Sequence, residues 1–97
     1  MLVRWLDDAL DDLDALADFI ASDNPTAANL IFSRITNAAD GLAAFPRRGR
    51  PGRRRGTREL VVTGTPWLIA YRITPDAVEV LRVLHGRQRW PARIHPA

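Results

Sequence analysis

The spacing of apolar and polar positions predicts two amphipathic helices in the first half of the chain. Between Leu10 and Ile20 the apolar residues recur at helical spacing, and aspartates occupy the opposite face. We therefore expect a helix over about residues 8–21. Asp7 or Asp8 is the expected N-cap, because a carboxylate there also meets the positive end of the helix dipole.

A second helix is expected after a short break. Asn24 is a favourable N-cap, and Pro25 suits the first helical position. Apolar residues then recur at helical spacing as far as Leu42, and the helix should end near Ala44, before a proline. Two helices joined by so short a link form a helical hairpin, whose wide apolar face can cover a sheet.

Four segments are rich in apolar, β-branched or aromatic residues and predict strands. Residues 2–6 precede the helices, and residues 58–63, 67–73 and 77–84 follow them, separated by short turns. The last three should form an antiparallel meander. The final strand is apolar on both faces, so it is either covered on both sides or central in the sheet. We predict an α+β fold in the order β-α-α-β-β-β, with a helical hairpin packed on a small, mainly antiparallel sheet.

Length and composition restrict the class of protein. The 97 residues, 46% of them hydrophobic, are expected to form one domain. Because the chain has no cysteine, and His85 and His95 have no acidic pair nearby, we expect no disulfide, metal or other cofactor. We see neither a signal peptide nor an apolar run long enough to span a membrane, so a cytoplasmic location is expected.

Charge is distributed unevenly along the chain. Residues 1–46 hold two arginines and eight aspartates, a net charge of −6, whereas residues 47–97 hold twelve arginines and three carboxylates, a net charge of +9. All basic side chains are arginines, which do not readily release their protons. Either the two halves serve different partners, or they neutralise each other within the fold.

Two segments concentrate groups that bind phosphate, carboxylate or nucleobases. The loop 46–57 is rich in Arg, Gly and Pro, and its Arg48-Gly49-Arg50-Pro51 matches the core of the AT-hook, a minor-groove DNA motif; nonspecific attraction to phosphate is the simpler explanation. In the segment after the last strand, His85 is either an acid–base group or a structural group that bonds the backbone. Trp90 either anchors the C-terminus or stacks on a base.

The element order and several motifs resemble the RelE/ParE superfamily, the toxins of type II toxin–antitoxin modules. The motifs are GTRELVV at residues 56–62, Ala70-Tyr71-Arg72, and VLRVLHGRQRWP at residues 80–91, together with the loop 49–52. The resemblance covers about residues 2–91 and is closest to the ParE-like, plasmid-stabilisation branch. It implies one of two activities: RelE-like toxins cut mRNA in the ribosomal A site, and ParE-like toxins poison DNA gyrase. Both are neutralised by an antitoxin whose C-terminal segment wraps the toxin.

The resemblance also implies that the nuclease chemistry is incomplete. Cleavage through the RNA 2′-hydroxyl needs an acid, a base and positive charge on the phosphorane. RelE-like enzymes take these groups from basic residues on the sheet and from a tyrosine near the C-terminus. Arg58 and Arg87 match two basic positions, Leu60 and Leu68 occupy two others, and no tyrosine follows Arg87. A non-catalytic ParE-like inhibitor is therefore our first expectation; a nuclease would use Arg58, His85, Arg87 and Arg89.

We expect a cognate antitoxin as partner, DNA gyrase or the ribosome and its mRNA as target, and no membrane contact. The antitoxin should cover the helical hairpin and the sheet edge with apolar residues, and its acidic residues should meet the basic half. The predicted antitoxin contacts are Leu13, Leu16, Ile20, Ile31, Ile35, Arg72 and Arg82. The predicted target contacts are Arg53, Arg54, Arg55, Arg58, Arg87, Arg89 and Trp90. An inactive relative, or a DNA-binding module that uses residues 47–58, is a further alternative.

Overall fold

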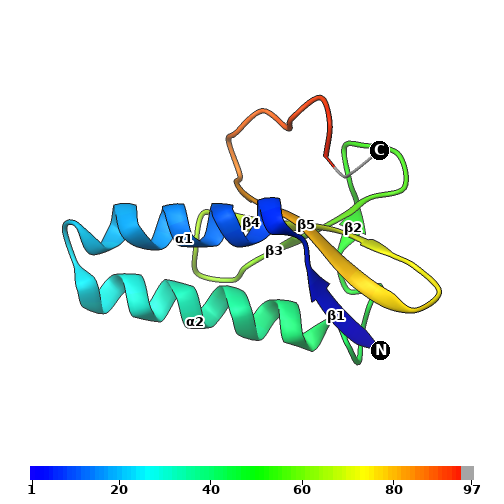
Figure 1. Ribbon diagram of the computed structural model, residues 1–97, viewed down its shortest axis with the longest axis horizontal. Helices are drawn as coiled ribbons and strands as arrows, with labels where there is room; N and C mark the ends of the chain where they lie inside the picture. Colours follow the sequence, from blue (N-terminus) through cyan, green and yellow to red (C-terminus); the bar gives the residue numbers. More distant parts are fainter. Residues whose placement is uncertain (95–97) are drawn as a thin grey trace.

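The computed structural model describes residues 1–94, so His95 lies outside the described residues. Two helices form a hairpin that packs against a five-stranded sheet (Figure 1). In chain order the elements are β1 (Leu2–Trp5), α1 (Asp7–Ala21), α2 (Pro25–Gly41), β2 (Arg50–Pro51), β3 (Arg58–Val61), β4 (Trp67–Ile73) and β5 (Ala77–His85). The predicted α+β class and the order of the predicted elements are confirmed.

The sheet has the strand order β1-β5-β4-β3-β2. β1 runs parallel to β5, and the other pairs are antiparallel. β5 has a neighbour on each side, which confirms its predicted central position. β2 was not predicted, because two residues inside the arginine-rich loop show no alternation; it exists through its pairing with Arg58 and Glu59 of β3.

Several predicted boundaries of helices and strands need correction. Asn24 does cap α2, since its side chain accepts the N–H of Ala27 at 3.1 Å. The N-cap of α1, however, is Leu6, and Asp7 and Asp8 lie in the first turn, where their charge still favours the helix dipole. α2 ends at Gly41 rather than near residue 44, and β1 and β3 are one and two residues shorter than predicted.

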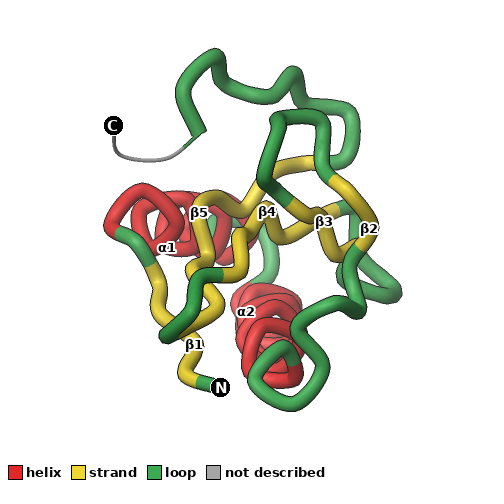
Figure 2. The backbone as a smooth tube through the Cα atoms, turned by 90° about the vertical axis from the view of Figure 1, so that its right-hand side faces the viewer, coloured by secondary structure: helices red, strands yellow, loops and turns green. Residues whose placement is uncertain are grey.

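Each face of the sheet is covered by a different part of the chain. Figure 2 shows the sheet between the helices and the C-terminal segment. On the helix side, buried residues of β4 and β5 pack against both helices: Ile69, Tyr71, Val78, Val80 and Val83 meet Ala9, Leu13, Leu16, Ile35 and Ala39. On the other side, Leu68, Ala70, Leu81 and Leu84 are covered by Trp90 and Ile94. β5 is thus both central and covered on both faces, which explains its apolar sequence.

α1 covers the edge of β5 beyond the end of β1. The N–H of Leu6 donates to Val80 O at 3.0 Å, and the N–H of Val83 donates to the Asp12 carboxylate at 2.9 Å. Asp12 therefore supplies an acceptor where no further strand pairs with β5. None of the helices within residues 1–94 combines the length and apolar character that crossing a membrane requires.

Candidate functional surfaces

Arg58 of β3 and Tyr71 of β4 are paired across the sheet and hold the segment that leads into β2. Tyr71 Oη donates a hydrogen bond to Pro46 O at 2.6 Å and accepts one from the N–H of Gly49 at 2.9 Å. The Arg58 guanidinium donates to the carbonyl of Arg47, at 3.1 Å, and to that of Gly49. A Cβ at Gly49 would stand 2.6 Å from Tyr71 Oη, so glycine is needed for this close approach.

These contacts bear on two predictions. Arg58, expected at a nuclease or target site, donates through Nη2 to two backbone carbonyls of the same chain. The AT-hook interpretation is wrong, because residues 48–51 are held in place by contacts within the fold. Gly49 is buried beside Tyr71, and Arg50 Nε pairs with the Glu59 carboxylate at 2.6 Å.

His85, at the end of β5, takes part in a tight backbone turn. Its Nδ1 accepts the N–H of Arg87 at 3.1 Å, and its carbonyl accepts the N–H of Gln88 at 2.8 Å. The imidazole stands edge-on to the Trp67 ring, with the ring centroids 5.3 Å apart. Of the two roles considered for His85, the geometry supports the structural one, because Nδ1 already accepts a hydrogen bond.

Arg53 and Arg54 point from the loop 52–57 onto the tail, which we define as residues 86–94. Their guanidinium groups donate at 3.0–3.5 Å to four backbone carbonyls, those of Gly86, Gln88, Trp90 and Pro91. Both side chains were predicted to contact a target, and the structure shows their donors engaged within the chain.

Trp90 closes the apolar face of the sheet that the helices leave open. Its side chain is only 4% exposed and packs in the cluster that contains Leu68 and Leu84. The Arg53 guanidinium lies 5.7 Å from the centroid of its ring. Of the two roles considered for Trp90, the geometry supports the anchor, since a ring so deeply buried offers no face to a base.

The predicted target residues that keep free guanidinium groups are Arg55, Arg87 and Arg89. All three are exposed and form no ion pair with any of residues 1–94. They lie on the loop 52–57 and on the tail, which are hydrogen-bonded to each other. We call this set the tail-end basic surface; unpaired positive charge of this kind is complementary to a polyanion or an acidic protein patch.

Arg72 and Arg82, predicted to contact an antitoxin, form ion pairs inside the fold. Arg72 Nε lies 2.6 Å from the Glu79 carboxylate, to which Arg4 donates at 3.1 Å. The hydrogen bond from Arg72, and after it that from Arg4, lowers the pKa of Glu79 against the opposing effect of burial. Arg82 binds Asp12 through Nε at 2.6 Å and Nη2 at 2.9 Å, and this contact raises the pKa of its guanidinium. Both arginines therefore bind carboxylates of their own chain.

The residues predicted as apolar antitoxin contacts are mostly buried in the free chain. Leu13, Leu16 and Ile35 lie in the helix-side core and present no free surface, while Ile20 and Ile31 are partly buried against it. The large apolar residues that the two helices do expose are Leu10, Phe19, Leu30 and Phe32. They lie at the edges of the predicted apolar helix faces. Sequence spacing alone does not show which apolar residues of such a face are buried and which stay exposed.

A groove runs between α2 and the edge of β3, where β2 has ended. We call it the partner groove; it measures about 350 Å³ and is lined by Arg34, Asn37, Ala38, Arg48 and residues 60–63. β2 pairs with Arg58 and Glu59 but does not reach Val61, so within residues 1–94 Val61 has β4 on one side and no strand on the other; Val61 is 51% exposed. The lining holds two arginines and no carboxylate.

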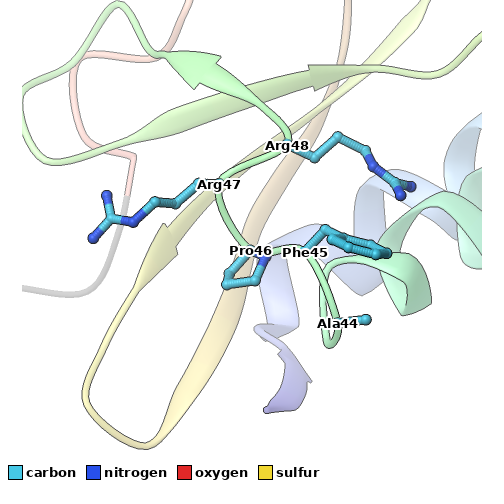
Figure 3. A pocket seen from close by; sticks show the side chains of 5 residues that line it. All are labelled: Ala44, Phe45, Pro46, Arg47 and Arg48. Carbon is cyan, nitrogen blue, oxygen red and sulfur yellow. The ribbon is translucent and has the colours of Figure 1, made fainter.

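A second hollow, of about 450 Å³, adjoins the partner groove and shares Arg48 with it. Figure 3 shows Phe45 and Arg48 directed to the same side of the loop and Arg47 directed to the other. The Arg48 guanidinium lies 4.9 Å from the centroid of the exposed Phe45 ring. Apolar surface flanked by guanidinium groups is complementary to a segment that carries both apolar and acidic residues.

A helical hairpin on a mainly antiparallel sheet with a basic end places the chain among the RelE/ParE-type toxins. The family model described as "ParE toxin of type II toxin-antitoxin system, parDE" matches residues 3–90. The chain therefore belongs to the ParE toxin family of type II toxin–antitoxin systems, which confirms the resemblance.

Relatives and solved structures agree with this assignment. The chain is 47% identical over 89 residues to the Sinorhizobium fredii protein Y4kP, covering 92% of each. It is 40% identical over 84 residues to Toxin RelE2 of Caulobacter vibrioides, covering 87% of this chain and 93% of that protein. A chain of the "Chromosomal ParDE TA system from P. aeruginosa" superimposes with a TM-score of 0.82 at 25% identity, over 88% of this chain and 95% of that one.

Proposed function

We propose that this toxin inhibits growth by binding a cytoplasmic target rather than by cutting RNA, and that the target is DNA gyrase, as its ParE-like sequence implies. The observation that carries the proposal is the position of Arg58. Its guanidinium, which a nuclease would direct at the scissile phosphate, donates to the carbonyls of Arg47 and Gly49. Leu60 and Leu68 occupy two further positions where the nuclease branch places basic groups. Positive charge on the phosphorane would thus be scarce at the sheet.

The tail-end basic surface is the proposed contact with the target. Arg55, Arg87 and Arg89 are exposed, and six other arginines of the basic half have donors engaged within the chain: Arg50, Arg53, Arg54, Arg58, Arg72 and Arg82. The free charge of this half is therefore found largely outside the sheet. A rigid display of guanidinium groups suits the recognition of an acidic patch or of phosphate in a gyrase–DNA complex.

The proposed partner is a cognate antitoxin, whose C-terminal segment covers the partner groove and the exposed apolar residues of the hairpin. An apolar side chain of this segment would pack on Val61, and acidic side chains would meet Arg34 and Arg48. The segment can also form backbone hydrogen bonds along β3, where the strand edge is unpaired.

Supercoiling and translation assays with purified toxin distinguish the two candidate targets. We expect micromolar toxin to stop gyrase supercoiling while translation continues, and added antitoxin to restore supercoiling. If translation stops, A-site cuts appear by primer extension and gyrase is unaffected, the toxin is a nuclease and the proposal is wrong. In that case alanine at Arg58, His85 and Arg87 together should abolish the cuts. Normal growth on induction without antitoxin would identify an inactive relative.

A further inference from the structure

The tail has few anchors of its own. The N–H groups of Gly86 and Gln88 donate to Pro66 O and His85 O, both at 2.8 Å. Beyond Gln88, no backbone N–H of the tail donates to another backbone group within residues 1–94. The part that contains Trp90 and Ile94 therefore depends on side-chain burial and on whatever binds its carbonyls.

Arg54 donates hydrogen bonds to the part of the tail beyond Gln88. Its Nε and Nη2 donate to Pro91 O at 3.1 and 3.0 Å, and Nη2 also donates to Trp90 O at 3.3 Å. Charged donors make stronger hydrogen bonds than neutral ones. Since the acceptors are backbone carbonyls, Arg54 fixes the course of the chain whatever side chains the tail carries.

Arg53 binds the first half of the tail. Its Nη1 and Nη2 donate to Gln88 O at 3.3 Å and to Gly86 O at 3.5 Å, while its guanidinium lies over the Trp90 ring. Its Nε is 3.9 Å from the buried Glu59 carboxylate, which keeps the side chain directed at the tail.

The loop that carries both arginines is itself shaped to meet the tail. The N–H of Gly52 donates to Thr57 O at 2.8 Å, and the N–H of Thr57 donates to Arg54 O at 3.1 Å. Gly56 closes the turn with φ of +78°, a conformation that favours glycine. A Cβ at Gly52 would stand 3.0 Å from the Trp90 ring, so the absence of a side chain there lets the indole approach.

We infer that Arg53 and Arg54 are positioning residues: they hold the tail, which carries Arg87 and Arg89, against the loop that carries Arg55, so that Trp90 covers the sheet. The loop 52–57 thus contributes to the target surface indirectly, because its arginines bind backbone carbonyls of the tail. The assignment of the target contact to the tail-end basic surface rests on the proposed function. The contact between loop and tail does not, because it follows from the hydrogen bonds described above.

Hydrogen exchange of the purified toxin tests the contact directly. Arg54→Ala should raise the exchange rate of the hydrogen-bonded tail amides, those of Gly86 and Gln88, about tenfold or more. These amides exchange when the tail opens, and the lost hydrogen bonds to a charged group contribute on that order to keeping it closed. Peptides covering β5 should keep their wild-type rates. Arg55→Ala is the matched control: it removes the same charge from the same loop, but its side chain contacts no tail carbonyl, so tail exchange should not change. Unchanged tail exchange in Arg54→Ala would overturn the inference.

Growth inhibition without antitoxin tests the positioning role. Arg54→Ala should weaken inhibition in proportion to the fraction of molecules whose tail has opened. Trp90→Ala keeps every arginine and removes the other anchor, so it should weaken inhibition as well, with unchanged β5 exchange showing that the sheet remains folded. Faster tail exchange with full inhibition would refute the positioning role. If the wild-type toxin does not inhibit growth, the proposed function fails, and the exchange experiment still decides whether the arginines hold the tail.

Discussion

Replacing Tyr71 by phenylalanine tests whether one hydroxyl holds the segment between α2 and β2. The Tyr71 side chain is fully buried, and its Oη bonds Pro46 O at 2.6 Å and the N–H of Gly49 at 2.9 Å. Phenylalanine keeps the ring and leaves no cavity of consequence. The substitution therefore removes two hydrogen bonds and little else.

The expected loss of stability follows from the backbone groups that the missing hydroxyl leaves unpaired. A typical hydrogen bond contributes about 0.5–1.5 kcal/mol net, and a buried polar group left unpaired costs about 1–3 kcal/mol. Gly49 is buried, so its N–H has no ready access to water. We expect Tyr71→Phe to lower the free energy of unfolding by about 2–4 kcal/mol, a large part of the total for a domain of this size. The melting temperature should fall by about 10 °C or more.

Urea denaturation measures this change. The midpoint should fall while the slope of the free energy with urea stays constant, because the unfolded and folded surfaces are nearly unchanged. Arg47→Ala is the control, since Arg47 uses its carbonyl, not its side chain, in this network. It should change stability by less than about 0.5 kcal/mol. A Tyr71→Phe effect as small as that of the control would refute the reasoning.

Three further predictions concern other parts of the molecule. Arg72 lowers the pKa of Glu79, so the stability that this carboxylate contributes is fully present above its unfolded pKa and is lost as the pH falls through the lowered folded value. Glu79→Gln should therefore flatten the pH dependence of the urea midpoint below about pH 5. Asp12→Asn should cost about 1–3 kcal/mol of unfolding free energy, because it weakens three hydrogen bonds, whereas Asp14→Asn, on the exposed face, should be nearly neutral. Val61→Asp should weaken binding of the cognate antitoxin about tenfold or more by calorimetry without lowering stability, since it places a charge in an apolar contact.

Each of these predictions has a contrary outcome. An acid-denaturation profile of Glu79→Gln identical to that of the wild type would show that this carboxylate does not govern acid stability. Equal stability of the Asp12 and Asp14 variants would mean that α1 does not secure the edge of β5. Full antitoxin affinity in Val61→Asp would move the antitoxin contact away from the partner groove.

Local pattern was sufficient for most of the secondary structure. The helical spacing around Leu10 to Ile20 and the Asn24-Pro25 start predict α1 and α2, because amphipathic spacing and capping depend on residues close in sequence. The apolar sequence of β5 indicates a central strand for a similar reason: every side chain of such a strand is buried, whichever face it occupies.

The functional role of the arginines was not predictable in this way. Arg53, Arg54, Arg55, Arg87 and Arg89 have the same charge and lie in similar basic segments, yet only the first two bind the tail. Whether a guanidinium is free depends on which carbonyl or carboxylate the fold brings within about 3 Å of it. Those acceptors lie 33–37 residues away along the chain.

The sequence by itself determined the family, the α+β class, both helices and the uneven division of charge, since each follows from composition, short-range periodicity or recognisable motifs. Only the tertiary structure decided that β2 forms, that Leu13, Leu16 and Ile35 lie in the core, and which arginines remain free. These properties depend on contacts between residues far apart in sequence, and such contacts exist only once the sheet has brought loop, tail and helices together.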